Sequence, residues 1–451
     1  MSYTSLAFWG LLGATLAGVA LLPKDWRAWW LIAMSLVFYI SPDPVRLVWL
    51  GVIVIAMTTT LRAPRGGPRW PASGTTIAFL VALLAWAKFA DALGLGNPDA
   101  PPGLSFIIFT AIAVVIDRTR GHQPIGWRDG LLHLAWFPKL LAGPIERSKD
   151  LIPQFGSLAL RPASTALGLS WLLVGLVKKL VIADSLAPTV DAAFAIPAYA
   201  PPVELLIAIY FFAFQIYCDF SGYADIAIGL SLMVGLRLSM NFDRPYLAPT
   251  ITEFWASRWH ISLAQWFRDY LYIPLGGSRR GWPRQMLNMM TVFLVSGLWH
   301  AGLGYGIGLG FLIWGGLNGF FVCLETRLPK PRPGVARIVG TIVTFHLVLL
   351  TWVFFRANSV SDALRILHRV ATAIFDLPSL VARYPFSSAQ LAGGAMILIL
   401  LIVEAMTGNK PPAERIARLG LPVRWAGWYA MVALLLLFGR WQETEFIYAG
   451  F

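Results

Sequence analysis

Long apolar runs separated by short polar links dominate both ends of the chain. A helix needs about 17 to 25 mostly apolar residues to cross a bilayer. The pattern therefore predicts membrane-spanning helices at residues 6–22, 26–40, 45–61, 75–93, 339–355, 391–406 and 425–438. The first run follows no basic segment and carries no small-residue cleavage pattern, so we expect a retained span rather than a signal peptide.

The middle of the chain is less regular. Two short runs at 104–116 and 131–142, the second interrupted by Pro138, are typical of re-entrant or half-spanning helices. Irregular backbone is tolerated at membrane depth only where protein or a water-filled cavity satisfies its polar groups, so we expect a cavity nearby. The run at 203–236 is long enough for more than one helix, and its polar stretch 219–225 predicts a break. Further spans are expected at 170–182, 288–301 and 307–324.

Two segments are too polar to span the membrane. Residues 240–284 are rich in Trp, Arg, Asp and Tyr and predict amphipathic helices at the membrane interface, and 357–388 form a second amphipathic region. The whole pattern predicts an all-α polytopic membrane protein with about eleven membrane-associated helices. We expect N-terminal helices over 1–100, a core with the candidate site over 101–356, and amphipathic and transmembrane helices over 357–451.

Composition supports a membrane protein and argues against a nucleic-acid partner. Hydrophobic residues make up 57% of the chain and charged residues 13%, whereas soluble domains carry about 25% charged residues. The net charge of +13 is spread over short loops such as 62–69. Positive-inside bias and attraction to anionic membrane lipid explain this spread. The basic segment 237–284 is then predicted to lie on the cytoplasmic side. Cys218 and Cys323 lie in apolar runs and are expected to be buried without a disulfide.

Two of the six histidines stand apart by context. His300 ends an apolar run between Gly297 and Gly302, and His260 follows Trp259 in the amphipathic segment. Histidine accepts and returns a proton near neutral pH, so either is a candidate general base. A buried histidine that only forms hydrogen bonds is the alternative, and we expect it for His346. The two candidates are 40 residues apart, so the sequence alone does not show that they meet.

Other chemistry finds less support. The chain contains no HExxH, CxxC or GxSxG motif, which argues against a metal site and a serine hydrolase. Asp219 and Asp225 are six residues apart and would lie on different faces of a continuous helix. We expect them to hold a buried arginine or tyrosine, with a proton relay as the alternative. The densest basic set favours interfacial anchoring, or else recognition of a phosphate-bearing donor; it comprises Arg244, Arg258, Arg268, Arg279 and Arg280.

Several segments together resemble the membrane-bound O-acyltransferases, in particular the bacterial branch that acylates envelope polymers such as alginate and teichoic acid. The central ones are Gln215 to Gly229, Asn241 to Tyr246, Glu253 to Trp255, Arg258 to Leu263, Arg268 to Gly277 and Ser296 to His300. Flanking ones are Phe137 to Pro144, Gly175 to Asp184 and Trp352 to Arg356. Each segment is weak alone, but the combination is specific and covers about Leu104 to Arg356.

The resemblance implies a fold, a reaction and a site. The fold is a ring of helices around a central funnel or tunnel. The reaction is transfer of an acyl group, here acetyl, from a cytoplasmic thioester such as acetyl-CoA or an acyl carrier to a hydroxyl of an exported polysaccharide, with a separate periplasmic acyltransferase as partner. Acyl transfer to teichoic acid, lipid or protein is an alternative, and a transporter or flippase is an alternative of another class, which the lack of an internal repeat disfavours.

The resemblance places His300 at the family's invariant histidine and His260 at its second polar position, which is a histidine in this bacterial branch, and makes both of them catalytic candidates. His300 would act as base, and His260 or backbone N–H groups would stabilise the oxyanion. Supporting or tunnel-lining candidates are Asp219, Ser221, Tyr223, Asp225, Trp299 and Asn288, and donor-binding candidates are Arg258, Arg268 and Arg279. Neither a metal nor a bound cofactor is implied. Ala301 stands where many relatives have glycine, which is a mild departure.

Overall fold

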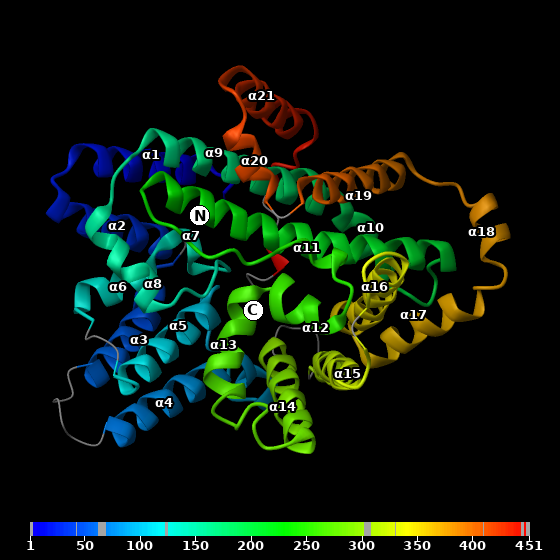
Figure 1. Ribbon diagram of the computed structural model, residues 1–451, viewed down its shortest axis with the longest axis horizontal. Helices are drawn as coiled ribbons and strands as arrows, with labels where there is room; N and C mark the ends of the chain where they lie inside the picture. Colours follow the sequence, from blue (N-terminus) through cyan, green and yellow to red (C-terminus); the bar gives the residue numbers. More distant parts are fainter. Residues whose placement is uncertain are drawn as a thin grey trace.

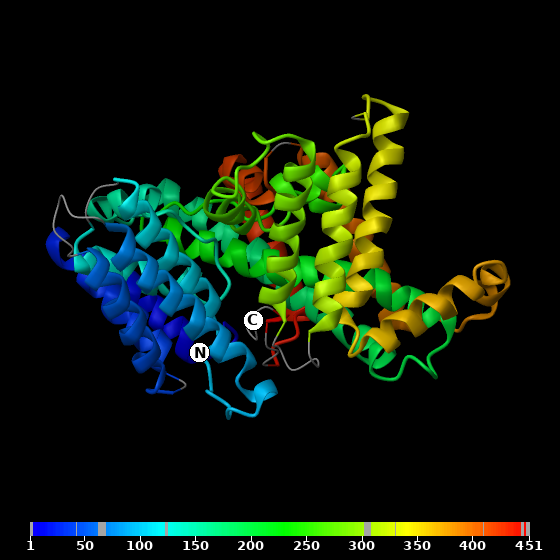
Figure 2. The ribbon, with the colours of Figure 1, turned by 90° about the horizontal axis from the view of Figure 1, so that it is seen from below.

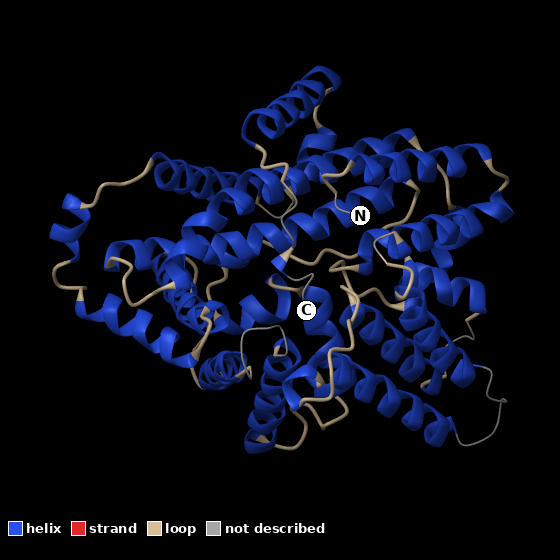
Figure 3. Ribbon diagram, turned by 180° about the vertical axis from the view of Figure 1, so that it is seen from behind, coloured by secondary structure: helices blue, strands red, loops and turns tan. Residues whose placement is uncertain are grey.

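The computed structural model describes residues 3–41, 43–61, 69–121, 125–301, 308–329, 331–408, 410–442 and 446–447. Over these ranges every regular element is a helix (Figure 3). Within the described ranges, six helices are long and apolar enough to cross a membrane. The prediction of an all-α polytopic membrane protein is thus confirmed. Most of the basic loop at 62–69, together with Gly302, lies outside the described residues.

The N-terminal helices follow the predicted runs to within a few residues. They are α1 (Leu6–Leu21), α2 (Lys24–Ile40), α3 (Arg46–Leu61), α4 (Arg69–Phe89) and α5 (Leu104–Thr119), with a short turn η1 (Asp91–Leu93) before α5. Ser5 caps the first helix, because its hydroxyl accepts a hydrogen bond from the Phe8 N–H at 3.2 Å. Gly103 starts α5 with a φ of 80°, where an added Cβ would lie 2.5 Å from the Leu140 carbonyl oxygen. Only glycine fits this close approach.

Of the two expected half-helices, the run at 131–142 appears as α6 (Trp127–Ala135) and α7 (Phe137–Leu140), which are separated at Trp136, and the run at 104–116 is the single helix α5 of 16 residues. Pro138 has no N–H to donate, so it suits the first turn of a new helix. The Trp136 indole donates to Ser231 Oγ at 2.9 Å, and the Phe137 N–H donates to Ser35 Oγ at 3.2 Å. These hydrogen bonds give polar groups at the break between α6 and α7 partners inside the protein. The turns α8 (Ser148–Leu151) and η2 (Ile152–Ser157) follow.

A long helical rod comprises α9 (Pro162–Leu176), the π-helical turn η3 (Val177–Ala183) and α10 (Asp184–Ala195). It runs beside α11 (Pro202–Met233), which crosses the molecule in Figure 1. The sequence predicted a break in α11 at residues 219–225, and this prediction was wrong, because the helix is continuous over 32 residues.

Partners in the rod explain why the polar stretch of α11 stays helical. Lys179 Nζ lies 2.6 Å from Asp219 and 2.9 Å from Asp184, and Lys178 Nζ lies 2.7 Å from Asp225. The expected partners of the two α11 carboxylates were arginine or tyrosine, so the partner type is corrected to lysine. Each pair neutralises a carboxylate that would otherwise be costly at this depth. The second Asp219 oxygen accepts the Ile447 N–H at 2.8 Å, which ties the C-terminal segment to the centre.

Glycines let the rod and α11 approach each other closely. A Cβ added to Gly175 would lie 2.6 Å from the Gly222 carbonyl oxygen, and a Cβ added to Gly168 would lie 2.5 Å from that of Gly229. Backbone contact of this kind is typical of helix packing in membranes, where small residues line the interface.

The amphipathic segment folds into short helical turns beneath α11. They are η4 (Pro245–Leu247), α12 (Ile251–Glu253), η5 (Phe254–Arg258), α13 (Ile261–Phe267) and η6 (Arg268–Tyr272). Next come α14 (Trp282–His300), α15 (Leu309–Glu325) and α16 (Val335–Arg356), which stand side by side in Figure 2. An added Cβ on Gly297 of α14 would lie 2.5 Å from the Phe311 carbonyl oxygen of α15.

The C-terminal region begins with α17 (Val360–Thr372) and α18 (Leu377–Arg383), which extend from one end of the molecule in Figure 1. The chain returns as α19 (Ser388–Thr407), α20 (Pro412–Arg418) and α21 (Leu421–Phe438). Large apolar side chains on the outer helices are exposed, for example Ile338, Ile342, Leu398 and Leu437. Such a surface fits a lipid environment.

Candidate active site

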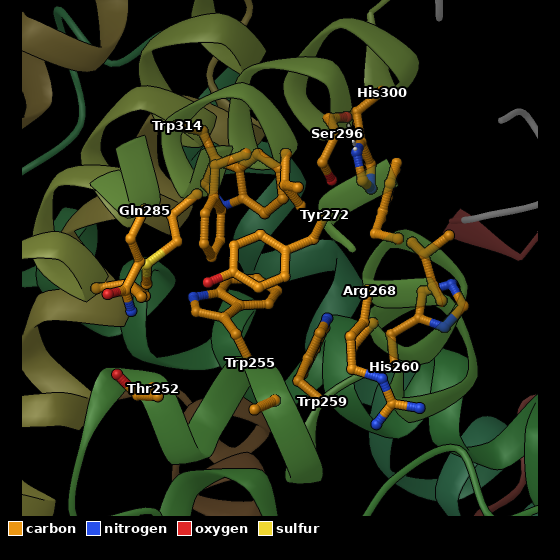
Figure 4. Close-up of a pocket in the computed structure, with 18 residues that line it drawn as sticks. Thr252, Trp255, Trp259, His260, Arg268, Tyr272, Gln285, Ser296, His300 and Trp314 are labelled. Carbon is orange, nitrogen blue, oxygen red and sulfur yellow. Dashed lines mark hydrogen bonds between the residues drawn. The ribbon is translucent and has the colours of Figure 1, made fainter. Parts of the chain in front are cut away.

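A cavity of about 290 Å³ lies between the short central turns and one side of α14 and α15. Its walls are mainly aromatic and apolar, with Trp255, Trp259, Phe267, Phe293 and Trp314 among them. Its polar groups are few: Thr252, His260, Arg268, Tyr272, Gln285, Ser296 and His300. Figure 4 shows both histidines and Arg268 on this cavity. An apolar space with a few polar groups is the usual form of a small-molecule site.

The structure brings His260 and His300 to one cavity, which the sequence alone did not show. Their exposed fractions are 4% and 2%. Burial lowers the pKa of the His260 imidazole well below its ordinary value, and repulsion by the charge of a protonated His300 lowers it further. His260 is therefore a neutral imidazole at physiological pH.

One hydrogen bond fixes the tautomer of His300. Its Nδ1 lies 2.7 Å from the backbone carbonyl oxygen of Ser296, one turn earlier in α14. A carbonyl oxygen only accepts, so Nδ1 carries the hydrogen and Nε2 carries the lone pair. Trp299, Trp314 and Phe355 surround the ring at centroid distances of 4.3, 4.9 and 5.4 Å. The imidazole is thus held in one orientation with a basic nitrogen.

His260 precedes α13 in a left-handed backbone conformation, with a φ of 44°. A non-glycine residue in this region is uncommon and is held there by its surroundings. The Ile261 N–H donates to the Asn241 carbonyl at 2.9 Å. The ring packs against Phe220 and Phe106 at centroid distances of 4.7 and 6.0 Å, and Nδ1 lies 3.2 Å from Asn241 Oδ1.

The predicted supporting residues lie around the cavity rather than on its lining. Asp219 and Asp225 form ion pairs with the lysines of η3. Tyr223 accepts the Leu141 N–H at 3.2 Å, and Asn288 donates to the Gly277 carbonyl at 2.9 Å. Ser221 is fully buried within α11, and Trp299 packs on His300. Their contacts are those of residues that hold the helices and loops in place.

The three candidate donor-binding arginines differ in their surroundings. Arg268 lines the cavity, its side chain is 59% exposed, and its Nε donates to Asp269 at 2.7 Å. The Arg258 side chain is 11% exposed and donates to Glu253 at 2.7 and 2.8 Å and to the Asp243 carbonyl at 3.0 Å, so its contacts are internal. Arg279 is exposed in the loop before α14.

Sequence reasoning missed Asn241 and the aromatic wall. Trp314 stacks on Trp352 at 5.9 Å, and Trp259 lies 5.0 Å from Trp352. Asn241 begins the family-like segment Asn241 to Tyr246, but nothing in that segment showed that its amide faces His260. The tryptophans stand in segments far apart in sequence, and only the packing of α15 and α16 against the central turns brings them together.

The described part of the chain contains no group of three or more His, Cys, Asp or Glu residues that could hold a metal ion. Cys218 and Cys323 are free thiols, the first buried and the second partly buried, and neither lines the cavity.

Comparison with known proteins places this site in a family context. Residues 130–357 match the model of the membrane-bound O-acyltransferase family. The chain is 37% identical over 357 residues to the probable alginate O-acetylase of Pseudomonas aeruginosa. The matched region covers 75% of this chain and 66% of the relative. It is 38% identical over 246 residues to a peptidoglycan O-acetyltransferase of Helicobacter pylori, covering 53% of this chain and 46% of that protein.

A more distant relative is a teichoic acid D-alanyltransferase of Bacillus subtilis, which is 22% identical over 309 residues, covering 62% of this chain and 76% of the relative. The chain spans just under two thirds of the length of the P. aeruginosa protein that it matches.

Proposed function

Because this chain belongs to the membrane-bound O-acyltransferase family, we propose that it is an acyltransferase of the bacterial inner membrane that serves the O-acetylation of an exported polysaccharide. The observation that carries the proposal is a largely apolar cavity with two buried histidines on its wall. In His300 the lone pair is on Nε2, because Nδ1 donates to Ser296. A neutral imidazole in this state is a general base.

The proposed reaction uses this lone pair. A hydroxyl is a weak nucleophile until its proton is removed. Nε2 of His300 accepts the hydroxyl proton as the oxygen forms a bond to the thioester carbonyl carbon. Collapse of the tetrahedral intermediate breaks the carbon–sulfur bond, and the imidazolium returns its proton to the departing thiolate. The products are an ester and a free thiol.

The proposed donor is a cytoplasmic thioester, either acetyl-CoA or an acyl carrier. The apolar walls suit the acyl group and exclude water, which would otherwise hydrolyse the thioester. Arg268, on the cavity and largely exposed, suits a phosphate of the donor. Arg279 is a second candidate on the exposed loop, whereas the internal bonds of Arg258 favour a structural role.

The proposed acceptor is a hydroxyl of an exported glycan, in line with the alginate and peptidoglycan named for the relatives. A separate periplasmic acyltransferase is the proposed partner. The ester formed at the cavity is then an intermediate, and the partner transfers its acetyl group to the glycan hydroxyl, which is the final acceptor. D-alanyl transfer to teichoic acid is the second candidate, supported by the more distant relative.

Mass analysis of the cell's exported glycans with and without the gene tests the proposal. We expect O-acetyl groups on one glycan to disappear with the gene and to return when it is restored. Unchanged acylation of all exported glycans would contradict an acyltransferase role. Loss of a D-alanyl ester instead of acetyl would select the second candidate.

A further inference from the structure

Three polar atoms converge on one side-chain oxygen next to the cavity. Asn241 Oδ1 lies 3.2 Å from the Ser262 N, 2.9 Å from the Ser262 Oγ and 3.2 Å from the His260 Nδ1. Asn241 and His260 are both buried, with exposed fractions of 1% and 4%. The side-chain amide therefore meets the ring inside the protein, where a lost hydrogen bond costs most.

The donors determine which amide atom is which. A backbone N–H only donates, so the atom facing the Ser262 N–H is the amide oxygen. The Ser262 hydroxyl accepts the Ile145 N–H at 3.0 Å, and its own hydrogen is then directed to Asn241. An inverted amide would place its NH₂ against the Ser262 N–H, so the side chain has one allowed orientation.

The orientation of Asn241 in turn determines the tautomer of His260. An amide oxygen only accepts, so the Nδ1 of His260 must carry a hydrogen. The lone pair of the neutral ring is then on Nε2. The backbone of the same segment also holds the histidine, because the Ile261 N–H donates to the Asn241 carbonyl and the Asp243 N–H donates to the Arg258 carbonyl at 3.0 Å.

We propose that Asn241 is a positioning residue that fixes His260 with its lone pair on Nε2, so that His260 accepts a proton or hydrogen bond in the cavity and is not an oxyanion donor while neutral. This inference rests on the proposed acyltransferase function and narrows the role that the family resemblance implied for His260. Other N–H groups must then stabilise the oxyanion.

A carboxylate at position 241 and an apolar side chain there should have different effects. In Asn241→Asp the carboxylate accepts the same three hydrogen bonds but stabilises the imidazolium of His260, so a higher pH is needed to keep the ring neutral. In Asn241→Leu no acceptor remains and the ring samples the other tautomer. A misplaced lone pair removes part of a general acid–base contribution, which is in full on the order of a hundred- to ten-thousandfold.

Inverted inner-membrane vesicles with radiolabelled acetyl-CoA provide the assay, read as label transferred to glycan at a series of pH values. We expect Asn241→Leu to lower kcat about tenfold or more with little change in KM. We expect Asn241→Asp to retain activity at high pH and to move the acidic limb of kcat/KM upward. Asn358→Leu, the same substitution at an exposed asparagine away from the cavity, should behave as the parent protein.

A double-mutant cycle with His260→Ala separates positioning from folding. If Asn241 acts through His260, Asn241→Leu should reduce the rate much less in the His260→Ala background than in the parent. An equal loss in both backgrounds, or an unshifted acidic limb in Asn241→Asp, would overturn the inference. Absence of acetyl transfer by the parent protein would instead refute the proposed function. The amount of each variant in the membrane shows whether a loss of activity comes from misfolding.

Discussion

At the scale of single residues, the two cavity histidines share one arrangement: Nδ1 faces an oxygen of the protein, and the lone pair is on Nε2. The oxygen is the Ser296 carbonyl for His300 and the Asn241 amide for His260. The motifs identified both histidines as candidates. They did not reveal these partners, since a tautomer depends on which oxygen lies next to the ring in three dimensions.

Acidification should inactivate the protein only well below the ordinary histidine pKa of about 6.5. Burial lowers the pKa of His260, so the ring stays neutral until the pH falls below that value. Below about 6.5 the unfolded chain binds a proton that the folded ring resists, so stability also decreases as the pH falls. The pH profile of acetyl transfer in vesicles checks this, and a fall in kcat/KM beginning above pH 7 would contradict it.

Two arginines of similar appearance in the sequence should respond differently to substitution. Arg268→Gln removes an exposed charge at the cavity, so we expect a severalfold higher KM for acetyl-CoA with a nearly unchanged melting temperature. Arg258→Gln removes the charged hydrogen bonds to Glu253 and to the Asp243 carbonyl, so we expect a lower melting temperature. Initial rates and thermal unfolding in detergent measure both. An unchanged donor KM for Arg268→Gln would remove Arg268 from the donor site.

At the scale of elements, the contact between the α9–η3–α10 rod and α11 supports the central part of the molecule. The polar stretch of α11 predicts a break when read alone, because Asp219 and Asp225 are costly in a membrane helix. The lysines that neutralise them come from η3, about 40 residues earlier, at 2.6 and 2.7 Å. The local sequence pattern identifies the polar residues of α11. Whether the helix continues through them depends on their ion pairs with another element.

Replacing Gly175 by alanine should destabilise this contact. The added Cβ would lie 2.6 Å from the Gly222 carbonyl oxygen, so the helices must separate, at a typical overpacking cost of about 1 to 3 kcal/mol. Gly13→Ala in α1 is the matched control, since no atom lies within 4 Å of its added Cβ. Thermal unfolding of the purified variants should show a lower melting temperature for the first alone. Equal melting temperatures would contradict the role of this glycine contact.

At the scale of the whole molecule, the length of the apolar runs predicted most spans to within a few residues, because the membrane requires long apolar helices. The cavity could not be derived in this way. Its lining comes from residues 252–272, 285–300, 314 and 322, which meet through the packing of α14 and α15 on the central turns. Aromatic contacts between such distant segments leave no periodic signal in the sequence.

The basic charge of residues 237–284 predicts that this segment faces the cytoplasm. Ser278 is exposed in the loop before α14 and offers a labelling position. In Ser278→Cys, we expect a membrane-impermeant thiol reagent to react in inverted vesicles and not in intact cells, beyond the background of Cys218 and Cys323. Reaction in intact cells would place this side in the periplasm and separate it from a cytoplasmic donor.

The proposal that His300 is the general base is tested most directly by His300→Ala, with acetyl transfer from radiolabelled acetyl-CoA to glycan measured in inverted vesicles. His346→Ala is the matched control, because His346 bonds to Tyr210 and does not line the cavity. We expect a loss of at least about a hundredfold for His300→Ala at an unchanged protein level, and normal transfer for the control. Transfer by His300→Ala at the parental rate would contradict the assignment.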